Sequence, residues 1–328
     1  MTHRIIYMGT PEFACPALRA LSERIDLDVA LVVTQPDRPA GRGRQLQSPP
    51  VKQLAELLGL PVYQPQSLRT AEQRQPLLDI RPDLIVVAAY GLILGRSILE
   101  LPMRGCVNLH ASILPRYRGA SPISAAILCG DQETGVTLMR MERGLDTGPV
   151  FDVVRIEIGG NDTTASLTDR LAVTASELLV LNIDGLLNGS LGAVTQPSGA
   201  TLTRPLVKDD GWIDWTRPMV EVERLVRAMW PWPRAWTTLA DGSAFQIHIA
   251  SIDPGQDNVT PGTLWNDRSG LRVRCGDGWL QIERGQLAGG KPLTRAQLAS
   301  KPQLASGAVL GGDIRPTVPG PMMSFKTG

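Results

Sequence analysis

Residues 1–189 alternate short apolar runs with stretches of helical periodicity, and this alternation restricts the possible folds more than any other feature. Apolar runs of strand length lie at 4–8, 29–33, 83–89, 107–110 and 136–141. The run at 29–33 is apolar throughout, as parallel strands buried on both faces are. Thr10 and Pro11 are suited to cap and begin a helix after the first strand. The pattern predicts an α/β fold with an open, mostly parallel sheet, whose ligands bind outside the carboxyl ends of the strands.

The end of this α/β part is marked by a long helix and a linker. Residues 163–187 have sustained helical periodicity with a leucine face. The stretch that follows is rich in Gly, Ser and Pro, which is typical of a linker. A chain of 328 residues suggests two domains more than one. We therefore expect a first domain at 1–189, a linker at 190–206 and a second domain at 207–328.

The second domain has a different composition. It holds all seven tryptophans, and short runs of alternating polarity lie at 244–252, 270–275 and 279–283. Glycine-containing turns separate these runs, which indicates a small antiparallel β-barrel. Between 284 and 328 there are six basic residues and one acidic residue. A small barrel with this local charge favours contact with nucleic acid.

The charge of the whole chain gives no such indication, because its formal net charge is +1. A second local patch is the loop at 34–50, which carries Arg38, Arg42 and Arg44 against a single acid, Asp37. The loop is either an ordinary solvated surface segment or an arm that grips phosphates near an active site.

Several classes of protein are disfavoured. The glycine turn after the first strand, G-T-P-E-F-A, lacks the G-x-G-x-x-G of dinucleotide-binding enzymes, and no Walker A sequence is present. The four cysteines have no C-x-x-C spacing, so we expect neither a redox motif nor a metal site. We find no signal peptide, and the longest apolar run, at 84–94, is too short to span a membrane. We therefore expect a cytoplasmic protein without a membrane partner.

The chemistry of the chain centres on the end of the strand at 107–110. Asn108 and His110 are two residues apart, so on an extended strand their side chains point to the same side. Asp146 lies in a loop flanked by glycines. An acyl-transfer site can be built from three such groups. The amide donates to an oxyanion, the histidine exchanges protons, and the acid orients the histidine. We expect these three residues to meet in space.

A serine or cysteine nucleophile is the rival interpretation. Ser112 follows His110 closely, but the chain has no G-x-S-x-G elbow. Cys106 and Cys129 lie in apolar surroundings and are most simply core residues.

Six motifs resemble those of the methionyl-tRNA formyltransferase family. They are G-T-P-E-F-A at 9–14, T-Q-P-D-R-P-A-G-R-G at 34–43, N-L-H-A-S-I-L-P-R-Y-R-G at 108–119, G-D-Q-E-T-G-V-T-L-M at 130–139, G-L-D-T-G-P at 144–149 and W-P-W-P at 230–233. The similarity covers nearly the whole chain. The Asn, His and Asp constellation is shared by 10-formyltetrahydrofolate transferases generally, whereas the arginine-bearing loop and the C-terminal barrel distinguish the tRNA enzymes.

The resemblance implies a Rossmann-like N-terminal domain with the formyltransferase fold and a C-terminal OB-like barrel. It implies transfer of the formyl group of 10-formyltetrahydrofolate to the α-amine of methionine on initiator methionyl-tRNA, for translation initiation. In this family Asn108, His110 and Asp146 match the catalytic residues. We expect the enzyme to act as a monomer and without a metal.

The resemblance also assigns binding residues and exposes one departure. The folate-binding segment corresponds to Ser112, Ile113, Leu114 and Pro115, with Ile113 in place of the usual leucine. Arg42 corresponds to an arginine that senses the acceptor end of the tRNA. After the linker the family often has A-T-Y-A-x-K, whereas this chain has A-T-L-T-R-P at 200–205. Arg204 and Lys208 are nearby, so a phosphate contact made by the family lysine is shifted here.

Alternative functions use the same residues. One group comprises formyltransferases that act on an amino sugar or on glycinamide ribonucleotide, and formyl-folate hydrolases that use water as the acceptor. The arginine-bearing loop and the barrel argue against that group. A non-enzyme alternative is an RNA-binding protein with an inactive α/β domain, and the intact constellation argues against it.

Overall fold

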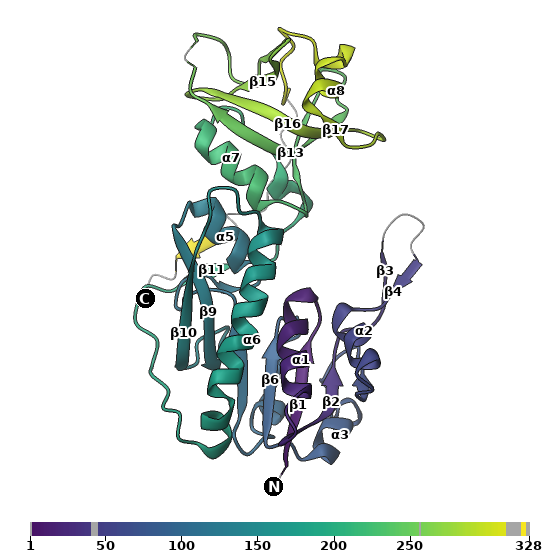
Figure 1. Ribbon diagram of the computed structural model, residues 1–328, viewed down its shortest axis with the longest axis vertical. Helices are drawn as coiled ribbons and strands as arrows, with labels where there is room; N and C mark the ends of the chain where they lie inside the picture. Colours follow the sequence, from purple (N-terminus) through teal and green to yellow (C-terminus); the bar gives the residue numbers. More distant parts are fainter. Residues whose placement is uncertain (1, 41–44, 256, 313–322, 326–328) are drawn as a thin grey trace.

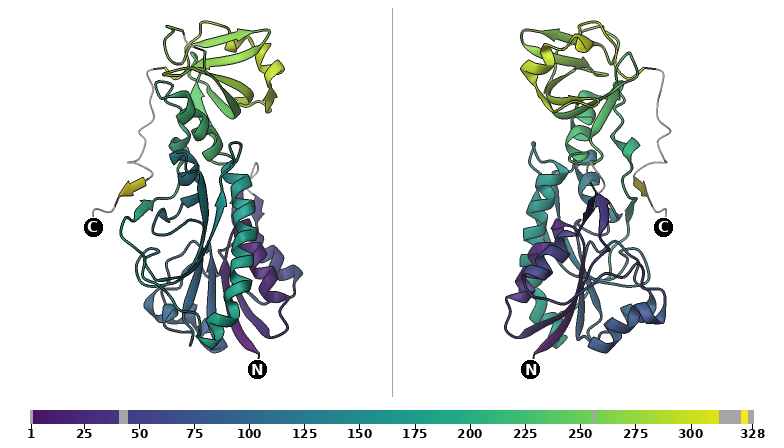
Figure 2. Two further views of the ribbon diagram at one scale, coloured as in Figure 1. Left: turned by 60° about the vertical axis from the view of Figure 1, so that its left-hand side comes forward. Right: turned by 90° about the vertical axis from the view of Figure 1, so that its right-hand side faces the viewer.

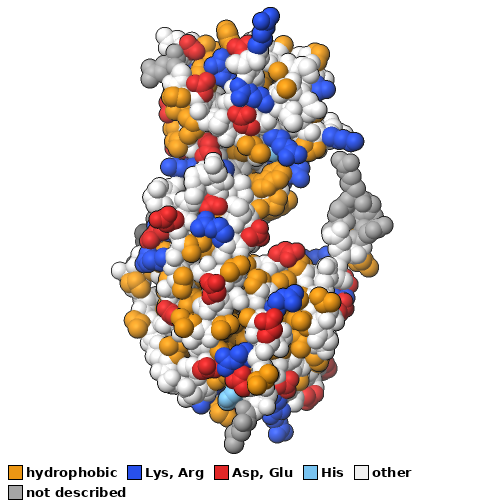
Figure 3. All heavy atoms as spheres, in the orientation of Figure 1, with side chains coloured by type: hydrophobic (Ala, Val, Ile, Leu, Met, Phe, Trp, Pro, Cys, Tyr) orange, Lys and Arg blue, Asp and Glu red, His pale blue; other side chains and the backbone are white. Residues whose placement is uncertain are grey.

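The computed structural model describes residues 2–40, 45–255, 257–312 and 323–325. It has two parts, one above the other along the longest axis of the molecule (Figure 1). The lower part is an α/β structure that contains the N-terminus, and the upper part consists mainly of β-strands. In Figure 3 the surface narrows between the two parts, and basic side chains are intermingled with acidic ones on the face shown.

The lower part is built on a seven-stranded sheet with the order β10-β9-β7-β6-β1-β2-β5. Its strands are β1 (His3–Gly9), β2 (Leu27–Val33), β5 (Val62–Tyr63), β6 (Leu84–Ala88), β7 (Cys106–His110), β9 (Glu133–Arg140) and β10 (Val150–Glu157). Strands from β7 to β5 run parallel to their neighbours, whereas β9 and β10 add an antiparallel edge. The prediction of an open, mostly parallel sheet is confirmed.

Helices cover both faces of this sheet (Figures 1 and 2). They are α1 (Cys15–Ser22), α2 (Pro50–Leu57), α3 (Ala71–Ile80), α4 (Arg96–Leu99), α5 (Pro122–Cys129) and α6 (Thr164–Asn188). Alternate residues of a strand point to opposite faces. Ile5 and Tyr7 accordingly pack in the core shared with α1 and α6, and Ile6 and Met8 pack in a second core on the other face. Burial on both faces explains why consecutive residues in the middle of β1 are apolar.

The predicted cap of the first helix is wrong. A 3-10 turn at Glu12–Ala14 precedes α1, and Thr10 does not cap either. Its hydroxyl instead donates to the carbonyl oxygen of Tyr90 at 2.9 Å. A capping side chain must accept a hydrogen bond from a backbone N–H of the first turn. The Thr10 hydroxyl is instead directed at the Tyr90 carbonyl oxygen, which follows the neighbouring strand β6.

Helix α6 has the length and apolar composition of a membrane-spanning helix. Eleven of its residues, including Leu171, Leu179 and Ile183, are buried in the core against the sheet. The core packing of α6 accounts for its apolar composition. Its N-terminus is capped by Thr163, in close agreement with the predicted range.

The upper part is an antiparallel sheet with the order β12-β13-β16-β15-β14, in which β17 also pairs with β16. Its strands are β12 (Ala235–Thr238), β13 (Ala244–Asp253), β14 (Leu264–Asp267), β15 (Gly270–Arg274), β16 (Trp279–Leu287) and β17 (Leu293–Thr294), accompanied by α7 (Met219–Ala228), α8 (Arg295–Ala299) and 3-10 turns at Lys208–Gly211 and Pro302–Leu304. The antiparallel pairing agrees with the prediction. Contacts with the lower part include a 2.7 Å hydrogen bond from Thr164 of α6 to the carbonyl oxygen of Ala228.

Between the two parts, a three-stranded sheet brings distant segments together. Strand β11 (Thr201–Thr203) pairs parallel with β8 (Arg118–Gly119) and antiparallel with β18 (Met323–Phe325). Figure 2 shows β18, in yellow, returning from the upper part to lie beside the lower one. The segment between the long helix and the second part therefore adds a strand beside the R-Y-R-G run at 116–119.

The arginine-bearing loop contains two short paired strands, β3 (Arg38–Ala40) and β4 (Gln45–Gln47), which project from the body of the lower part (Figure 1). Asp37 at its base is bound by Lys52 at 2.9 Å. Arg42, the residue expected to contact tRNA, and Arg44 lie outside the described residues.

Candidate active site

Two of the three expected catalytic residues lie at the end of β7. Asn108 is 9% exposed and His110 is 6% exposed. Asn108 pairs with Val87 of β6 on one side and with Met139 of β9 on the other. Within the ranges that the structure describes, the Asn108 amide has no hydrogen bond to protein. It is therefore available to a bound substrate.

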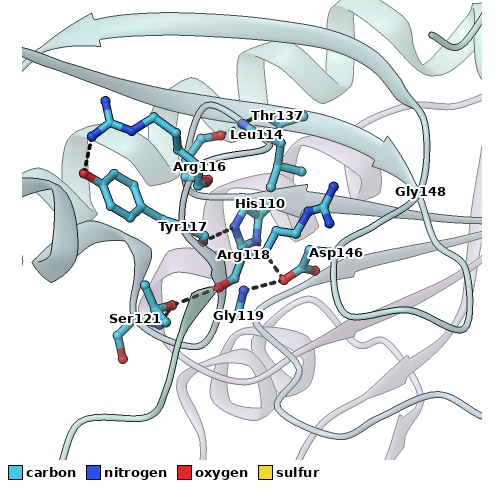
Figure 4. Close-up of polar contacts among 12 residues, drawn as sticks. His110, Leu114, Arg116, Tyr117, Arg118, Gly119, Ser121, Thr137, Asp146 and Gly148 are labelled. Carbon is cyan, nitrogen blue, oxygen red and sulfur yellow. Dashed lines mark hydrogen bonds and ion pairs between the residues drawn. The ribbon is translucent and has the colours of Figure 1, made fainter. Parts of the chain in front are cut away.

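The imidazole of His110 lies between two partners (Figure 4). One ring nitrogen, Nε2, is 2.9 Å from the carbonyl oxygen of Tyr117. The other, Nδ1, is 3.7 Å from Oδ2 of Asp146. The carbonyl oxygen can only accept, so Nε2 carries a proton and Nδ1 faces the carboxylate. The expected approach of His110 and Asp146 is observed.

Asp146 is held in an unusual backbone conformation. Its φ is 49°, in the left-handed region that costs a non-glycine residue on the order of 1 kcal/mol. Its Oδ2 accepts a 2.8 Å hydrogen bond from the backbone N–H of Gly119. The carboxylate is thus fixed by β8 while it faces His110.

Tyr117, which the sequence interpretation did not single out, supports the histidine. It also has a positive φ, of 57°. Its backbone N–H donates to the hydroxyl of Thr201 at 2.8 Å, and its phenol donates to Asp131 at 2.6 Å. Burial, with the Asp131 hydrogen bond next, raises the pKa of the phenol well above its usual range, so Tyr117 contributes a carbonyl oxygen rather than an acid or base.

The segment expected to bind folate is mostly committed to the fold. The Thr137 hydroxyl donates to the Ser112 carbonyl at 2.6 Å and accepts from the backbone N–H of Leu114 at 3.2 Å. Ser112, Leu114 and Pro115 are buried, whereas Ile113 is only partly buried. Of these four side chains, Ile113 is therefore the best placed to touch a ligand.

The rival nucleophiles are not supported. The Ser112 hydroxyl is fully buried and donates to the carbonyl oxygen of Arg116 at 2.6 Å. Burial raises the pKa of the Cys106 thiol to about 12, which suppresses its nucleophilic thiolate. Cys129 is exposed, so its assignment to the core is wrong. It is the last residue of α5, where the helix leaves the core.

No group of three metal-ligating side chains occurs in the part of the chain that the structure describes. The expectation of metal-free chemistry remains a prediction.

Comparison with known proteins identifies the family of both parts of the chain. Residues 3–183 match the family model described as "Formyl transferase", and residues 205–303 match "Formyl transferase, C-terminal domain". A methionyl-tRNA formyltransferase of Ectopseudomonas mendocina (strain ymp) is 49% identical over 312 residues, which cover 94% of this chain and 98% of that protein.

Two solved structures share the fold at low sequence identity. An N-formyltransferase from Helicobacter canadensis, in complex with folinic acid and dTDP-3-aminofucose, has a TM-score of 0.63 at 18% identity and covers 86% of this chain and 98% of its own. A methionyl-tRNA formyltransferase from Clostridium thermocellum has a TM-score of 0.54 at 18% identity and covers 77% and 95%.

The mostly parallel sheet and the family matches over 3–183 and 205–303 define a transferase of formyl groups. The chain belongs to the methionyl-tRNA formyltransferases. Its reaction is therefore formylation of methionyl-tRNA, and the resemblance seen in the motifs is confirmed.

Proposed function

We propose that the formyl donor is 10-formyltetrahydrofolate, that the acceptor is the α-amine of methionine on initiator methionyl-tRNA, and that Asn108, His110 and Asp146 carry the reaction. The observation that supports this best is the position of His110 between the Tyr117 carbonyl and the Asp146 carboxylate. Asn108, on the same strand, has an amide without a hydrogen bond to any residue that the structure describes. The enzyme would act as a monomer in the cytoplasm, without a metal or a membrane partner.

In the proposed reaction the amine nitrogen bonds to the formyl carbon, and the bond between that carbon and N10 of the folate breaks. Asn108 donates to the formyl oxygen as negative charge develops on it. His110 donates to the same oxygen from Nδ1 when it is protonated, because Nε2 is already bound to Tyr117. Each such donor contributes a few kcal/mol to lowering the barrier, roughly 3 kcal/mol.

Asp146 has two tasks in this scheme. Its carboxylate stabilises the positive charge of protonated His110. It also accepts the proton that the amine loses, directly or through water, and this proton finally passes to N10 as the folate leaves. The 3.7 Å separation of Nδ1 and Oδ2 is longer than a hydrogen bond, so Nδ1 is not committed to the carboxylate and can donate to a bound substrate.

We propose that the donor binds along the segment from Ser112 to Pro115, with Ile113 making the side-chain contact. A flat apolar ligand suits a partly open isoleucine whose neighbours are fixed by hydrogen bonds. The Asn108 amide fits the formyl oxygen, because it lies two residues before His110 on β7 and has no hydrogen bond to protein within the described residues.

For the tRNA, we propose that residues 207–328 form a binding domain, that 190–206 link it to the 1–189 domain, and that Arg42 contacts the acceptor end. Arg204 is a poor substitute for the family lysine, since both ends of its guanidinium are bound to Asp210, at 2.8 and 2.6 Å. Lys208 is exposed and lies 5.5 Å from the centre of the Trp236 ring. Its ammonium group is better placed to meet a phosphate.

Competing acceptors test the proposal. Purified enzyme would receive 10-formyltetrahydrofolate with charged initiator methionine tRNA, charged elongator methionine tRNA and an amino sugar in separate and mixed reactions. A strong preference for the initiator is expected. Transfer to the sugar, or hydrolysis of the donor with no acceptor consumed, would overturn the substrate assignment. Arg42→Ala should raise KM for tRNA while leaving folate binding unchanged.

A further inference from the structure

The segment after α6 reaches into the loop that carries Asp146. Gln196 donates from its amide nitrogen to the carbonyl oxygens of Asp146, at 2.8 Å, and Gly148, at 2.7 Å. Its amide oxygen accepts from Nε and Nη2 of Arg118, at 3.1 and 2.6 Å. An amide side chain has two donor hydrogens and two acceptor lone pairs, so Gln196 uses its whole capacity within the protein.

Besides Gln196, this loop is held by the Gly119 N–H at the Asp146 carboxylate and by the Arg140 N–H at the Pro149 carbonyl oxygen. Residues 142–145, immediately before Asp146, are exposed. Asp146 itself has a left-handed φ, which an aspartate keeps only when its surroundings impose it. Gln196 binds the carbonyl oxygens on both sides of Thr147, and thereby fixes the turn at Asp146. Arg118 in turn fixes Gln196, and it comes from β8, the strand whose Gly119 binds the Asp146 carboxylate. Figure 4 shows Arg118 beside the Asp146 loop.

We propose that Gln196 is a positioning residue for Asp146, which it holds at His110 through the backbone of the loop. The inference rests on the proposed function, because it takes Asp146 as the group that acts on His110. Gln196 is expected to touch no substrate atom. Its loss should therefore lower the rate of the chemical step and leave substrate binding nearly intact.

Two variants of Gln196 and one control variant distinguish a positioning role from a general structural role. Gln196→Ala removes all four hydrogen bonds. Gln196→Glu keeps the size and the contact with Arg118, but it sets a carboxylate against two carbonyl oxygens and cannot donate. Ser198→Ala changes an exposed residue of the same segment and serves as the matched control. Thermal unfolding of each variant monitors the fold, and Gln196→Glu keeps the test valid if Gln196→Ala fails to fold.

The measurement is steady-state kcat and KM for 10-formyltetrahydrofolate and for initiator methionyl-tRNA. We expect both Gln196 variants to lose about 10- to 100-fold in kcat with KM values within threefold of wild type, and Ser198→Ala to match wild type. When Gln196 is substituted in an Asp146→Asn background, kcat should fall less than threefold further, because the two residues act as one unit.

The outcomes are distinguishable. The positioning role would be overturned if both Gln196 variants kept full kcat, or if they lost the same factor in kcat in the wild-type and Asp146→Asn backgrounds. In either case, formylation of methionyl-tRNA by the wild-type enzyme would leave the proposed function standing. Failure of the wild-type enzyme to formylate initiator methionyl-tRNA would overturn the proposed function itself.

Discussion

The carbonyl oxygen of Tyr117 lies 2.9 Å from Nε2 of His110, and this contact orients the imidazole from the side opposite Asp146. The carbonyl is in turn fixed, because the backbone N–H of Tyr117 donates to Thr201 of β11 at 2.8 Å. A residue more than eighty positions along the chain thus takes part in aligning the histidine.

Replacing His110 by Ala should lower kcat at least about 100-fold, because a positioned proton donor contributes 10²- to 10⁴-fold. The fold should survive, since the backbone of β7 remains paired on both sides. Single-turnover formylation of methionyl-tRNA measures the loss, with circular dichroism as the check on the fold. Asp146→Asn should lose less than His110→Ala. Normal turnover in the His110 variant would remove the histidine from the mechanism.

Thr201→Val should leave the Tyr117 N–H buried without an acceptor. The expected cost is about 1–3 kcal/mol in the free energy of unfolding, together with a several-fold drop in kcat as the Tyr117 carbonyl shifts away from His110. Urea unfolding and steady-state kinetics give the two numbers. Thr201→Ser keeps the hydroxyl and should behave as wild type. If the valine and serine variants had the same kcat, the hydrogen bond would have no role in alignment.

Gly119→Ala should separate β8 from β11. Gly119 has a φ of 103°, and a Cβ there would collide with the carbonyl oxygen of Thr203. Because the same glycine binds the Asp146 carboxylate, kcat should fall together with stability. Gly105 is the matched control, since its φ is 79° but no atom lies within 4 Å of a Cβ built on it. Gly105→Ala should cost about 1 kcal/mol from backbone strain alone and retain full kcat.

His248, on β13, should make the protein less stable in mild acid. It is 4% exposed, its Nδ1 has no partner among the described residues, and burial, followed by the charges of Arg234 and Arg284, lowers its pKa from 6.5 to about 4. Between these values the unfolded chain binds a proton that the folded chain refuses. The free energy of unfolding therefore falls as pH decreases from about 6.5 to about 4.

The size of this effect between pH 7 and pH 5 should be roughly 1–2 kcal/mol. Urea titrations of wild type and His248→Gln at the two pH values isolate it, because every other titrating group is shared. His3→Gln serves as the control, since His3 lies at the surface. If His248→Gln lost as much free energy of unfolding between pH 7 and pH 5 as wild type, His248 would not be the group responsible.

The sequence predicts the parts of this structure that depend on local patterns. The strands β1, β2, β6, β7 and β9 follow from runs that are apolar because both of their faces are covered. The place of His110 at the carboxyl end of β7 follows from the strand pattern. The approach of Asp146 does not, because β9 runs antiparallel to β7 and ends opposite Val107, so the loop that carries Asp146 must fold back to reach His110. Local patterns fail at Thr10, where a carbonyl distant in the chain captures the hydroxyl.

The residues that hold the site are not predictable in this way. Tyr117 acts through its backbone carbonyl, which every residue has, so its identity carries no signal. Gln196 and Thr201 lie in a polar stretch that is typical of a linker, and their partners are 50 and 84 positions away. The one local indication is the glycine-flanked Asp146, whose left-handed turn requires external support.

The positions of Gln196 and Thr201 also matter for where the boundary between the two domains is drawn. The two matched family regions end at residue 183 and resume at residue 205, so both residues fall between them. If Gln196 and Thr201 act as proposed, the segment needed for catalysis extends beyond the first matched region. A chimera that takes residues 3–183 from this enzyme would contain Asn108, His110 and Asp146. It would lack Gln196 and Thr201, which hold the backbone beside Asp146 and His110.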